Sequence, residues 1–307
     1  MNEIFFRDLQ KIAGEERCYA GEKMSSHTTF RVGGPAEYYV RPRRTQVAEI
    51  IALCQTYDIP WLVIGNGSNL LVGDRGIRGL VLELGQEMAV VTAEGNVIKA
   101  QAGALLSAAA REAAKCSLTG MEFASGIPGT IGGAVVMNAG AYGGEMSQIV
   151  KKATVLTPEG VEKELSLQEL DFGYRHSSIP VHHYIVLDVE LLLQPGDAQQ
   201  IQERMAELRS QRSKKQPLEY PSAGSTFKRP EGYYAGKLIQ DAGLRGYQVG
   251  DAQVSEKHCG FVINRGQATA AEIRQLITDV QRQVETQFGV KLDTEVRFVG
   301  EFIPSIR

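Results

Sequence analysis

A glycine-rich stretch in the middle of the chain constrains its fold most. Residues 125–145 read S-G-I-P-G-T-I-G-G-A-V-V-M-N-A-G-A-Y-G-G-E and contain no lysine or arginine. Glycine lacks a Cβ, so backbone N–H groups can approach a ligand closely, and successive amides aimed at one point bind phosphate. The interleaved apolar residues, among them Ile131 and Val135, favour a packed segment over a loose connector. The stretch therefore predicts a site for a phosphate-bearing ligand, and a purely structural loop is the alternative.

A second glycine turn follows a predicted buried strand. Residues 61–64 read W-L-V-I, and G-N-G-S-N-L-L follows at 65–71. Ligands of α/β units commonly bind where such a strand ends. Two glycine turns of this kind predict that the chain holds a long, anionic ligand at two separate points.

Composition narrows the class of protein. A chain of 307 residues fits two domains, and a formal net charge of −3 argues against general attraction to nucleic acid. Its four cysteines form no CxxC pair, which indicates reduced thiols and neither a disulfide framework nor a zinc site. Without a signal-peptide core or an apolar run of about 18–20 residues, we expect a cytoplasmic protein that contacts no membrane.

Periodicity predicts a mixture of helices and hairpins. Helices are expected from Thr45, over 105–118, from Asp197, and over 269–288, where Thr269 and Glu272 form a capping box. Hairpins are expected over 88–101 and 153–165, and a strand over 184–193. Hairpins beside a few helices favour an α+β fold. Composition shifts towards loops after the basic end of the helix that starts at Asp197, so we place a domain boundary near residue 207.

The standard signatures of nucleotide and hydrolase sites are missing. No GK[ST] triplet occurs, and Leu70 stands where a dinucleotide fingerprint needs its third glycine. The chain has no HExxH or G-x-S-x-G motif, and the adjacent His182 and His183 cannot both face one ion from a strand, so no metal is expected. A dinucleotide bound without these loops suggests a flavin, for which the protein supplies binding and charge placement.

Several separate motifs together resemble one enzyme family. They are G-N-G-S-N-L at 65–70, S-G-I-P-G-T-I-G-G at 125–133, N-A-G-A-Y-G at 138–143, G-Y-R at 173–175, A-G-S-T-F-K at 223–228 and E-V-R-F-V-G at 295–300. In this order, over nearly the whole chain, the set resembles the UDP-N-acetylenolpyruvoylglucosamine reductases. The resemblance implies an FAD-binding domain of the vanillyl-alcohol-oxidase (PCMH) type over 1–207, with lobes of about 1–88 and 89–207. It also implies a smaller α+β substrate domain over 208–307, with a strand over 293–303 that returns to the active site.

The same resemblance implies the chemistry. Non-covalent FAD and the co-substrate NADPH would reduce the enolpyruvyl ether of a UDP-sugar to UDP-N-acetylmuramate, in peptidoglycan precursor synthesis. Hydride from flavin N5 would add to the methylene carbon, and Ser225 would protonate the adjacent carbon. Arg175, a permanent fork-shaped cation, suits the developing negative charge. Glu295 would assist if it is protonated or hydrogen-bonded.

Binding residues follow from the matched motifs. Those expected at the cofactor are Gly65, Asn66, Gly67, Ser68, Asn69, Leu70, Ser125, Gly126, Ile127, Pro128, Gly129, Thr130, Gly132, Gly133, Asn138, Gly140 and Ala141. Those expected at the UDP-sugar substrate are Tyr174 and Lys228 from these motifs and, outside them, Lys215 in the basic run and Asn264 after the predicted strand 261–263.

One feature departs from part of the family. Some members carry an insertion after the G-Y-R arginine that folds a tyrosine over the substrate, whereas Arg175 and Ser225 here leave little room for one. The chain therefore resembles the shorter variant. Two other functions stay open at this point, a flavin-dependent oxidase of an alcohol or lactone and a non-catalytic UDP-sugar-binding protein.

Overall fold

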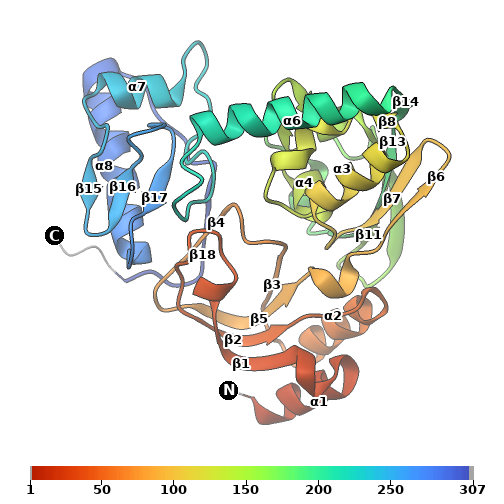
Figure 1. The fold of residues 1–307 in the computed structure, drawn as a ribbon. Helices are drawn as coiled ribbons and strands as arrows, with labels where there is room; N and C mark the ends of the chain where they lie inside the picture. Colours follow the sequence, from red (N-terminus) through yellow and green to blue (C-terminus); the bar gives the residue numbers. More distant parts are fainter. Residues whose placement is uncertain (1, 304–307) are drawn as a thin grey trace. The chain divides into compact units, whose positions relative to one another are not determined.

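The chain divides into two compact units. The computed structural model describes residues 2–303, drawn in Figure 1. Unit 1 comprises the residues up to 20, 38–66 and 79–212, and unit 2 comprises 21–37, 67–78 and the chain from 213 onward. Neither unit is continuous in sequence, whereas the composition predicts a single boundary near residue 207. Composition cannot detect the two short N-terminal segments that fold with the C-terminal part.

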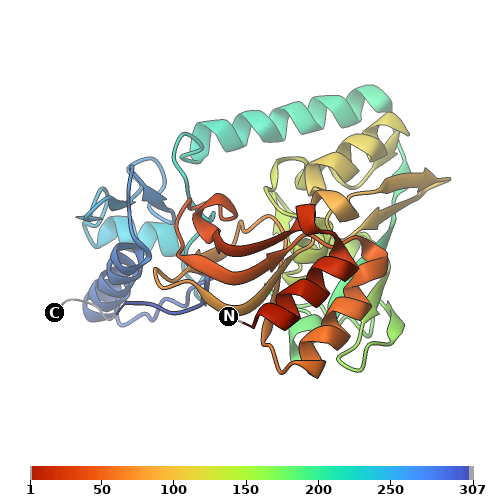
Figure 2. The ribbon, with the colours of Figure 1, turned by 90° about the horizontal axis from the view of Figure 1, so that it is seen from below.

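The N-terminal lobe of unit 1 is a sheet with two helices, seen clearly in Figure 2. The sheet has the order β1-β2-β5-β3, formed by Cys18–Lys23, Pro35–Val40, Ile77–Glu83 and Trp61–Ile64. The helices are α1, Glu3–Ala13, and α2, Val47–Thr56. Their apolar faces, with Phe5, Leu9, Ile50 and Cys54, are buried in the core of unit 1. Burial of these faces holds β3 in place, and the first glycine turn follows β3 directly.

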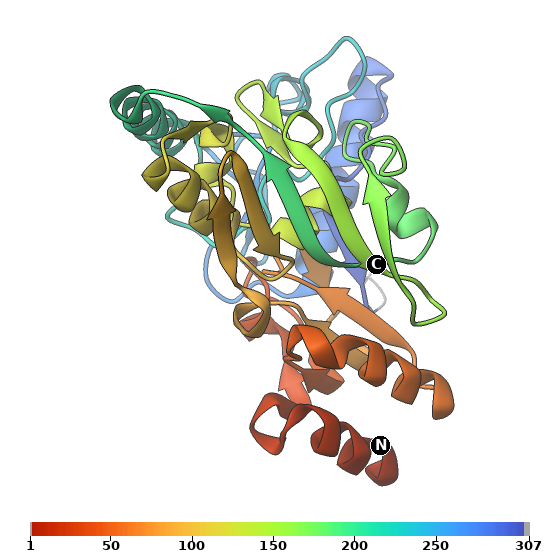
Figure 3. The same cartoon turned by 90° about the vertical axis from the view of Figure 1, so that its right-hand side faces the viewer.

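The second lobe of unit 1 is built on the five-stranded antiparallel sheet visible in Figure 3. Its order is β12-β11-β13-β7-β6, formed by Glu162–Ser166, Val150–Leu156, Ile185–Leu192, Val97–Gln101 and Val91–Glu94. The helices of this lobe are α3, Leu106–Lys115, α4, Ile131–Val136, α5, Ser178–Val181, and most of α6, Ala198–Lys215. Short strand pairs complete it: β8, Leu118–Thr119, with β14, Gln194–Pro195, and β9, Gly140–Ala141, with β10, Gly144–Glu145.

Unit 2 has its own core around one long helix. Helix α8, Ala270–Phe288, packs on the sheet β15-β16-β17, formed by Gln248–Val249, Ala252–Val254 and Val262–Asn264, with α7, Ala235–Asp241, beside it (Figure 1). A parallel pair of β4, Leu70–Val72, and β18, Arg297–Val299, completes the unit. Asp74 of the 67–78 segment accepts hydrogen bonds from the first two amides of α8, each at 2.8 Å.

The predicted α+β class is confirmed, and the differences are local. Both hairpins and the capping box of Thr269 and Glu272 are present. Thr45 lies inside a 3-10 turn, and the helix begins at Val47. The strand predicted over 293–303 is limited to β18, because residues 293–295 instead exchange single backbone hydrogen bonds with residues 226–228.

The described residues were expected to contain neither a membrane span nor a metal site. Within residues 2–303, no helix is both long enough and apolar enough to cross a bilayer. The same part of the chain contains no group of three or more His, Cys, Asp or Glu side chains arranged to hold a metal ion.

One of the four cysteines is exposed and the other three are buried. Cys116 is exposed, while Cys18, Cys54 and Cys259 are buried. Burial raises the pKa of Cys18 to about 11 and that of Cys54 to about 12, and it also raises the pKa of Cys259. We expect one thiol to react rapidly with a disulfide reagent at pH 8 and three more only after unfolding. Absorbance titration measures this, and rapid labelling that persists in Cys116→Ser would contradict it.

Candidate functional site

The two glycine stretches meet within unit 1. A Cβ on Gly65 would lie 2.2 Å from the Oγ1 of Thr130, so only glycine allows this approach. Beside it, the Nδ2 of Asn66 donates to the carbonyl of Pro128 at 2.9 Å. The turn after β3 and the loop before α4 therefore lie in direct contact, although about 60 residues separate them in the sequence.

This contact leaves a set of backbone donors available. Among residues 2–303, no carbonyl or side-chain acceptor takes the amides of Gly65, Asn66 or Gly129. The amides of Gly132 and Gly133 differ, since they donate to the carbonyl of Ala102 and to the Oγ1 of Thr130. The sequence predicts all five as cofactor contacts. The amides of the last two are used within the protein, and their predicted contact with the cofactor stays a prediction.

The second half of the first turn belongs to unit 2. Gly67 has φ +59°, and a Cβ there would lie 2.0 Å from the carbonyl oxygen of His27. The Nδ2 of Asn69 donates to the carbonyl of Glu295 at 3.1 Å, and the carbonyl of Asn69 accepts from the amide of Arg297 at 2.9 Å. Leu70 then pairs with Arg297 in β4 and β18. Asn69 therefore ties the predicted cofactor turn to the backbone of a predicted catalytic residue.

Ser225 and Glu295 lie on neighbouring backbone segments of unit 2. Ser225 forms an antiparallel bridge with Phe261, and the amide of Glu295 donates to the carbonyl of Thr226 at 2.9 Å. The amide of Lys228 donates to the carbonyl of Asp293 at 2.8 Å, which extends the pairing. The side chain of Ser225 is exposed and that of Glu295 is half-buried. Glu295 thus lies opposite Thr226, the residue after Ser225, and Lys228 follows three residues further along the same segment.

Arg175 is presented by a tight turn in unit 1. Gly173 and His176 exchange both backbone hydrogen bonds, so Tyr174 and Arg175 form a two-residue turn. Arg175 has φ +54°, a left-handed conformation that costs a side-chain-bearing residue about 1–2 kcal/mol. Its guanidinium lies 5.2 Å from the ring centroid of Tyr174 and donates to the carbonyl of Gly140 at 3.4 Å. Arg175 thus lies against the N-A-G-A-Y-G segment.

Two asparagines predicted to contact ligands are buried and hydrogen-bonded within the protein. Asn264 is 2% exposed, donates to the carbonyl of Phe30, and accepts from the amides of Gly266 and Ala268. Asn138 is 1% exposed and hydrogen-bonds to backbone groups through both its amide nitrogen and its amide oxygen. Both side chains are therefore anchored within the protein, and the predicted contacts of Asn264 with the substrate and of Asn138 with the cofactor stay predictions.

Arg212 of α6 is a residue that motif reasoning misses. A Cβ on Gly126 would lie 3.2 Å from its Nη1, so the guanidinium sits directly at the glycine loop. Burial lowers the pKa of Arg212, and the neighbouring Tyr142 opposes that shift. In the sequence this arginine is hidden in a run of basic residues at the end of a helix, most of which are exposed. Arg212 is thus a half-buried cation placed directly against the glycine loop.

The remaining predicted residues are exposed or part of the same segments. Tyr174 is 56% exposed, Lys215 is exposed at the end of α6, and Lys228 is half-buried. Within the glycine stretch, the Oγ of Ser125 donates to the carbonyl of Glu122, and the amide of Ile127 donates to that of Ala124. The last two predicted cofactor residues, Gly140 and Ala141, form β9.

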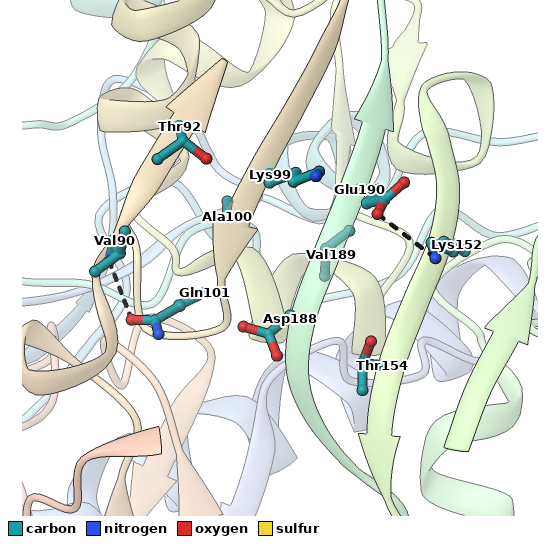
Figure 4. A pocket seen from close by; sticks show the side chains of 10 residues that line it. All are labelled: Val90, Thr92, Lys99, Ala100, Gln101, Lys152, Thr154, Asp188, Val189 and Glu190. Atoms are coloured by element: carbon teal, nitrogen blue, oxygen red, sulfur yellow. Dashed lines mark hydrogen bonds and ion pairs between the residues drawn. The ribbon is translucent and has the colours of Figure 1, made fainter. Parts of the chain in front are cut away.

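A separate hollow lies on the open face of the five-stranded sheet (Figure 4). It has a volume of about 250 Å³ and is lined by side chains of β6, β7, β11 and β13. Its charges are already balanced: Lys152 pairs with Glu164 and Glu190, Lys99 with Glu94, and Asp188 with Arg44. A paired, polar sheet face of this kind offers no unneutralised charge for an anionic ligand, and it contains none of the predicted residues.

Comparison with known proteins assigns both parts of the chain. Residues 36–166 match the family model of an FAD-binding domain, and residues 216–299 match the C-terminal domain of UDP-N-acetylenolpyruvoylglucosamine reductase. The UDP-N-acetylenolpyruvoylglucosamine reductase of Agathobacter rectalis is 55% identical over 314 residues, covering 98% of this chain and 100% of that protein. The corresponding reductase of Lachnoclostridium phytofermentans is 53% identical, covering 98% and 99%.

A solved structure gives the same result for the fold. The UDP-N-acetylenolpyruvylglucosamine reductase of Thermus caldophilus superposes with a TM-score of 0.78 at 38% identity, covering 90% of this chain and 97% of that one. The motifs quoted above, the two family models and relatives that match from end to end agree. The chain belongs to the UDP-N-acetylenolpyruvoylglucosamine reductase family.

Proposed function

We propose that Arg175, Ser225 and Glu295 carry out the reduction of UDP-N-acetylglucosamine enolpyruvate to UDP-N-acetylmuramate in this chain. As a member of its family, the chain is an FAD-containing oxidoreductase of peptidoglycan precursor synthesis with NADPH as co-substrate. The observation that supports the residue assignment most is the backbone pairing of Glu295 with Thr226, the residue next to Ser225. A cytoplasmic location stays a prediction.

The residues present fit an anionic dinucleotide. The amides of Gly65, Asn66 and Gly129 are available donors at the contact of the two glycine turns, and Arg212 adds a half-buried positive charge beside Gly126. Backbone amides and a guanidinium are suitable partners for a diphosphate. FAD, once reduced by NADPH, supplies the hydride when it is bound. The residues of this chain orient the substrate, stabilise the developing negative charge and donate a proton.

Each catalytic side chain has a role that suits its chemistry. The guanidinium of Arg175 stabilises the negative charge that develops as the enolpyruvyl group takes up hydride. The hydroxyl of Ser225 gives its proton to the adjacent carbon, since an enolate is basic enough to accept it. Glu295 supports this charge as a protonated or hydrogen-bonded carboxyl group. The exposed Tyr174 and Lys215 and the half-buried Lys228 are proposed contacts of the UDP-sugar, the lysines at its diphosphate or carboxylate.

Gly65→Ala tests the cofactor site. The new methyl group would lie 2.2 Å from the Oγ1 of Thr130, so the two turns must separate and their amides lose alignment. We expect the purified variant to retain less than about a tenth of the wild-type FAD, because about 1.4 kcal/mol of lost binding is already tenfold. Flavin absorbance per polypeptide measures this. Gly95→Ala is the control, since Gly95 has φ +59° but no atom within 4 Å of an added Cβ.

Ser225→Ala tests the proton donor. Turnover should fall by roughly 10²–10⁴, the usual contribution of a positioned acid, because the substrate carbanion has no donor. Reduction of the flavin by NADPH should stay at the wild-type rate, and stopped-flow absorbance separates the two half-reactions. Ser222→Ala, three residues upstream, is the matched control. Equal loss in both half-reactions would exclude Ser225 as the donor.

A further inference from the structure

The turn that carries Arg175 needs support from outside itself. Arg175 occupies a left-handed position where glycine is ordinarily preferred, and its turn is closed by the two hydrogen bonds between Gly173 and His176. A side-chain-bearing residue keeps such a conformation when its surroundings hold it there. The direction of the guanidinium therefore depends on what anchors this turn.

Asn138 makes that anchor with both ends of its amide. Its Nδ2 donates to the carbonyl of Gly173 at 3.0 Å, the first residue of the turn. Its Oδ1 accepts from the amide of Ser147 at 2.9 Å. The carbonyl of Gly173 also accepts from the amide of His176 at 3.2 Å, so both of its lone pairs are used. Asn138 thus links the Arg175 turn to the segment that follows the glycine stretch.

The position of Asn138 is itself closely defined. It follows α4 directly, has φ +40°, and is 1% exposed. On the outgoing side of the turn, the buried hydroxyl of Ser177 donates to the carbonyl of Val136, at the end of the same helix. The turn is therefore attached at both ends to the C-terminal end of α4, and the carbonyl of Gly140 accepts from Arg175 itself.

We propose that Asn138 is a positioning residue for Arg175, and that it holds the catalytic turn through its hydrogen bond to the Gly173 carbonyl. An amide can donate to that carbonyl while it accepts from the amide of Ser147, and asparagine also tolerates the left-handed backbone. Aspartate keeps the acceptor and loses the donor. This inference rests on the proposed role of Arg175 and gives Asn138 no contact with FAD or substrate.

Two variants of the full-length holoenzyme test it. Asn138→Gly removes both hydrogen bonds and retains the backbone conformation, while Asn138→Asp removes only the donor to Gly173. For both, we expect flavin reoxidation by the enolpyruvyl nucleotide to slow by roughly 10- to 100-fold, since a small misplacement of a catalytic group has effects of that size. FAD content and the rate of flavin reduction by NADPH should equal those of the wild type. Ser178→Ala, which removes a buried hydrogen bond to the carbonyl of Glu169 in the same segment, is the control. It should leave the FAD content, the rate of flavin reduction and the rate of flavin reoxidation unchanged.

A double-mutant cycle distinguishes positioning from general loosening. In the Arg175→Ala background, Asn138→Asp should change the reoxidation rate by less than about twofold, because there is no guanidinium left to position. The inference is overturned if the two effects multiply, if Asn138→Asp reoxidises at the wild-type rate, or if either Asn138 variant loses FAD. Failure of the wild-type enzyme itself to reoxidise with the enolpyruvyl nucleotide would instead overturn the proposed function.

Discussion

The close approach of Gly65 to Thr130 is the constraint on which unit 1 depends. No other residue type fits at position 65, because a Cβ there would overlap the threonine hydroxyl. Thr130 also accepts from the amide of Gly133 and so caps α4, which fixes the loop on the other side of the contact. One side chain thus sets both the start of a helix and the spacing of two backbone turns. The donors that remain open at this contact are backbone amides, whose direction is set by the fold.

Unit 2 depends on segments that arrive from distant parts of the chain. The 67–78 segment contributes β4 to the pair with β18, and Asp74 from the same segment caps α8. Asn69 bonds to the carbonyl of Glu295 just before β18 begins. A charged cap at a helix N-terminus stabilises typically by about 0.5–2 kcal/mol, so the helix and the segment support each other. The fold of the C-terminal part is therefore incomplete without residues near the N-terminus.

The sequence predicts elements whose signals are local. The capping box of Thr269 and Glu272, the strand of residues 61–64 and the two hairpins are all present, because each is specified by neighbouring residues. The assignment of segments 21–37 and 67–78 to unit 2 depends on contacts between residues far apart in sequence, which periodicity does not encode. The same limit affects the site. The sequence does not show that Asn264 is buried, or that Arg212, which stands in a basic run, lies against the glycine loop.

Several left-handed residues of unit 1 carry side chains where glycine would be free of strain, and three of them lie in or beside the Arg175 turn and the N-A-G-A-Y-G segment. These three are Asn138, Tyr142 and Arg175. At Arg175 the proposed role needs a guanidinium, so glycine is excluded by chemistry, and the turn retains a cost of about 1–2 kcal/mol. At Asn138 the amide makes two buried hydrogen bonds, each contributing about 0.5–1.5 kcal/mol, which offsets a cost of similar size. Arg175 and Asn138 thus keep left-handed backbones for different reasons. The hydrogen bond from Asn138 to the Gly173 carbonyl holds the turn of Arg175. The same bond, with the one from the Ser147 amide, offsets the strain at Asn138.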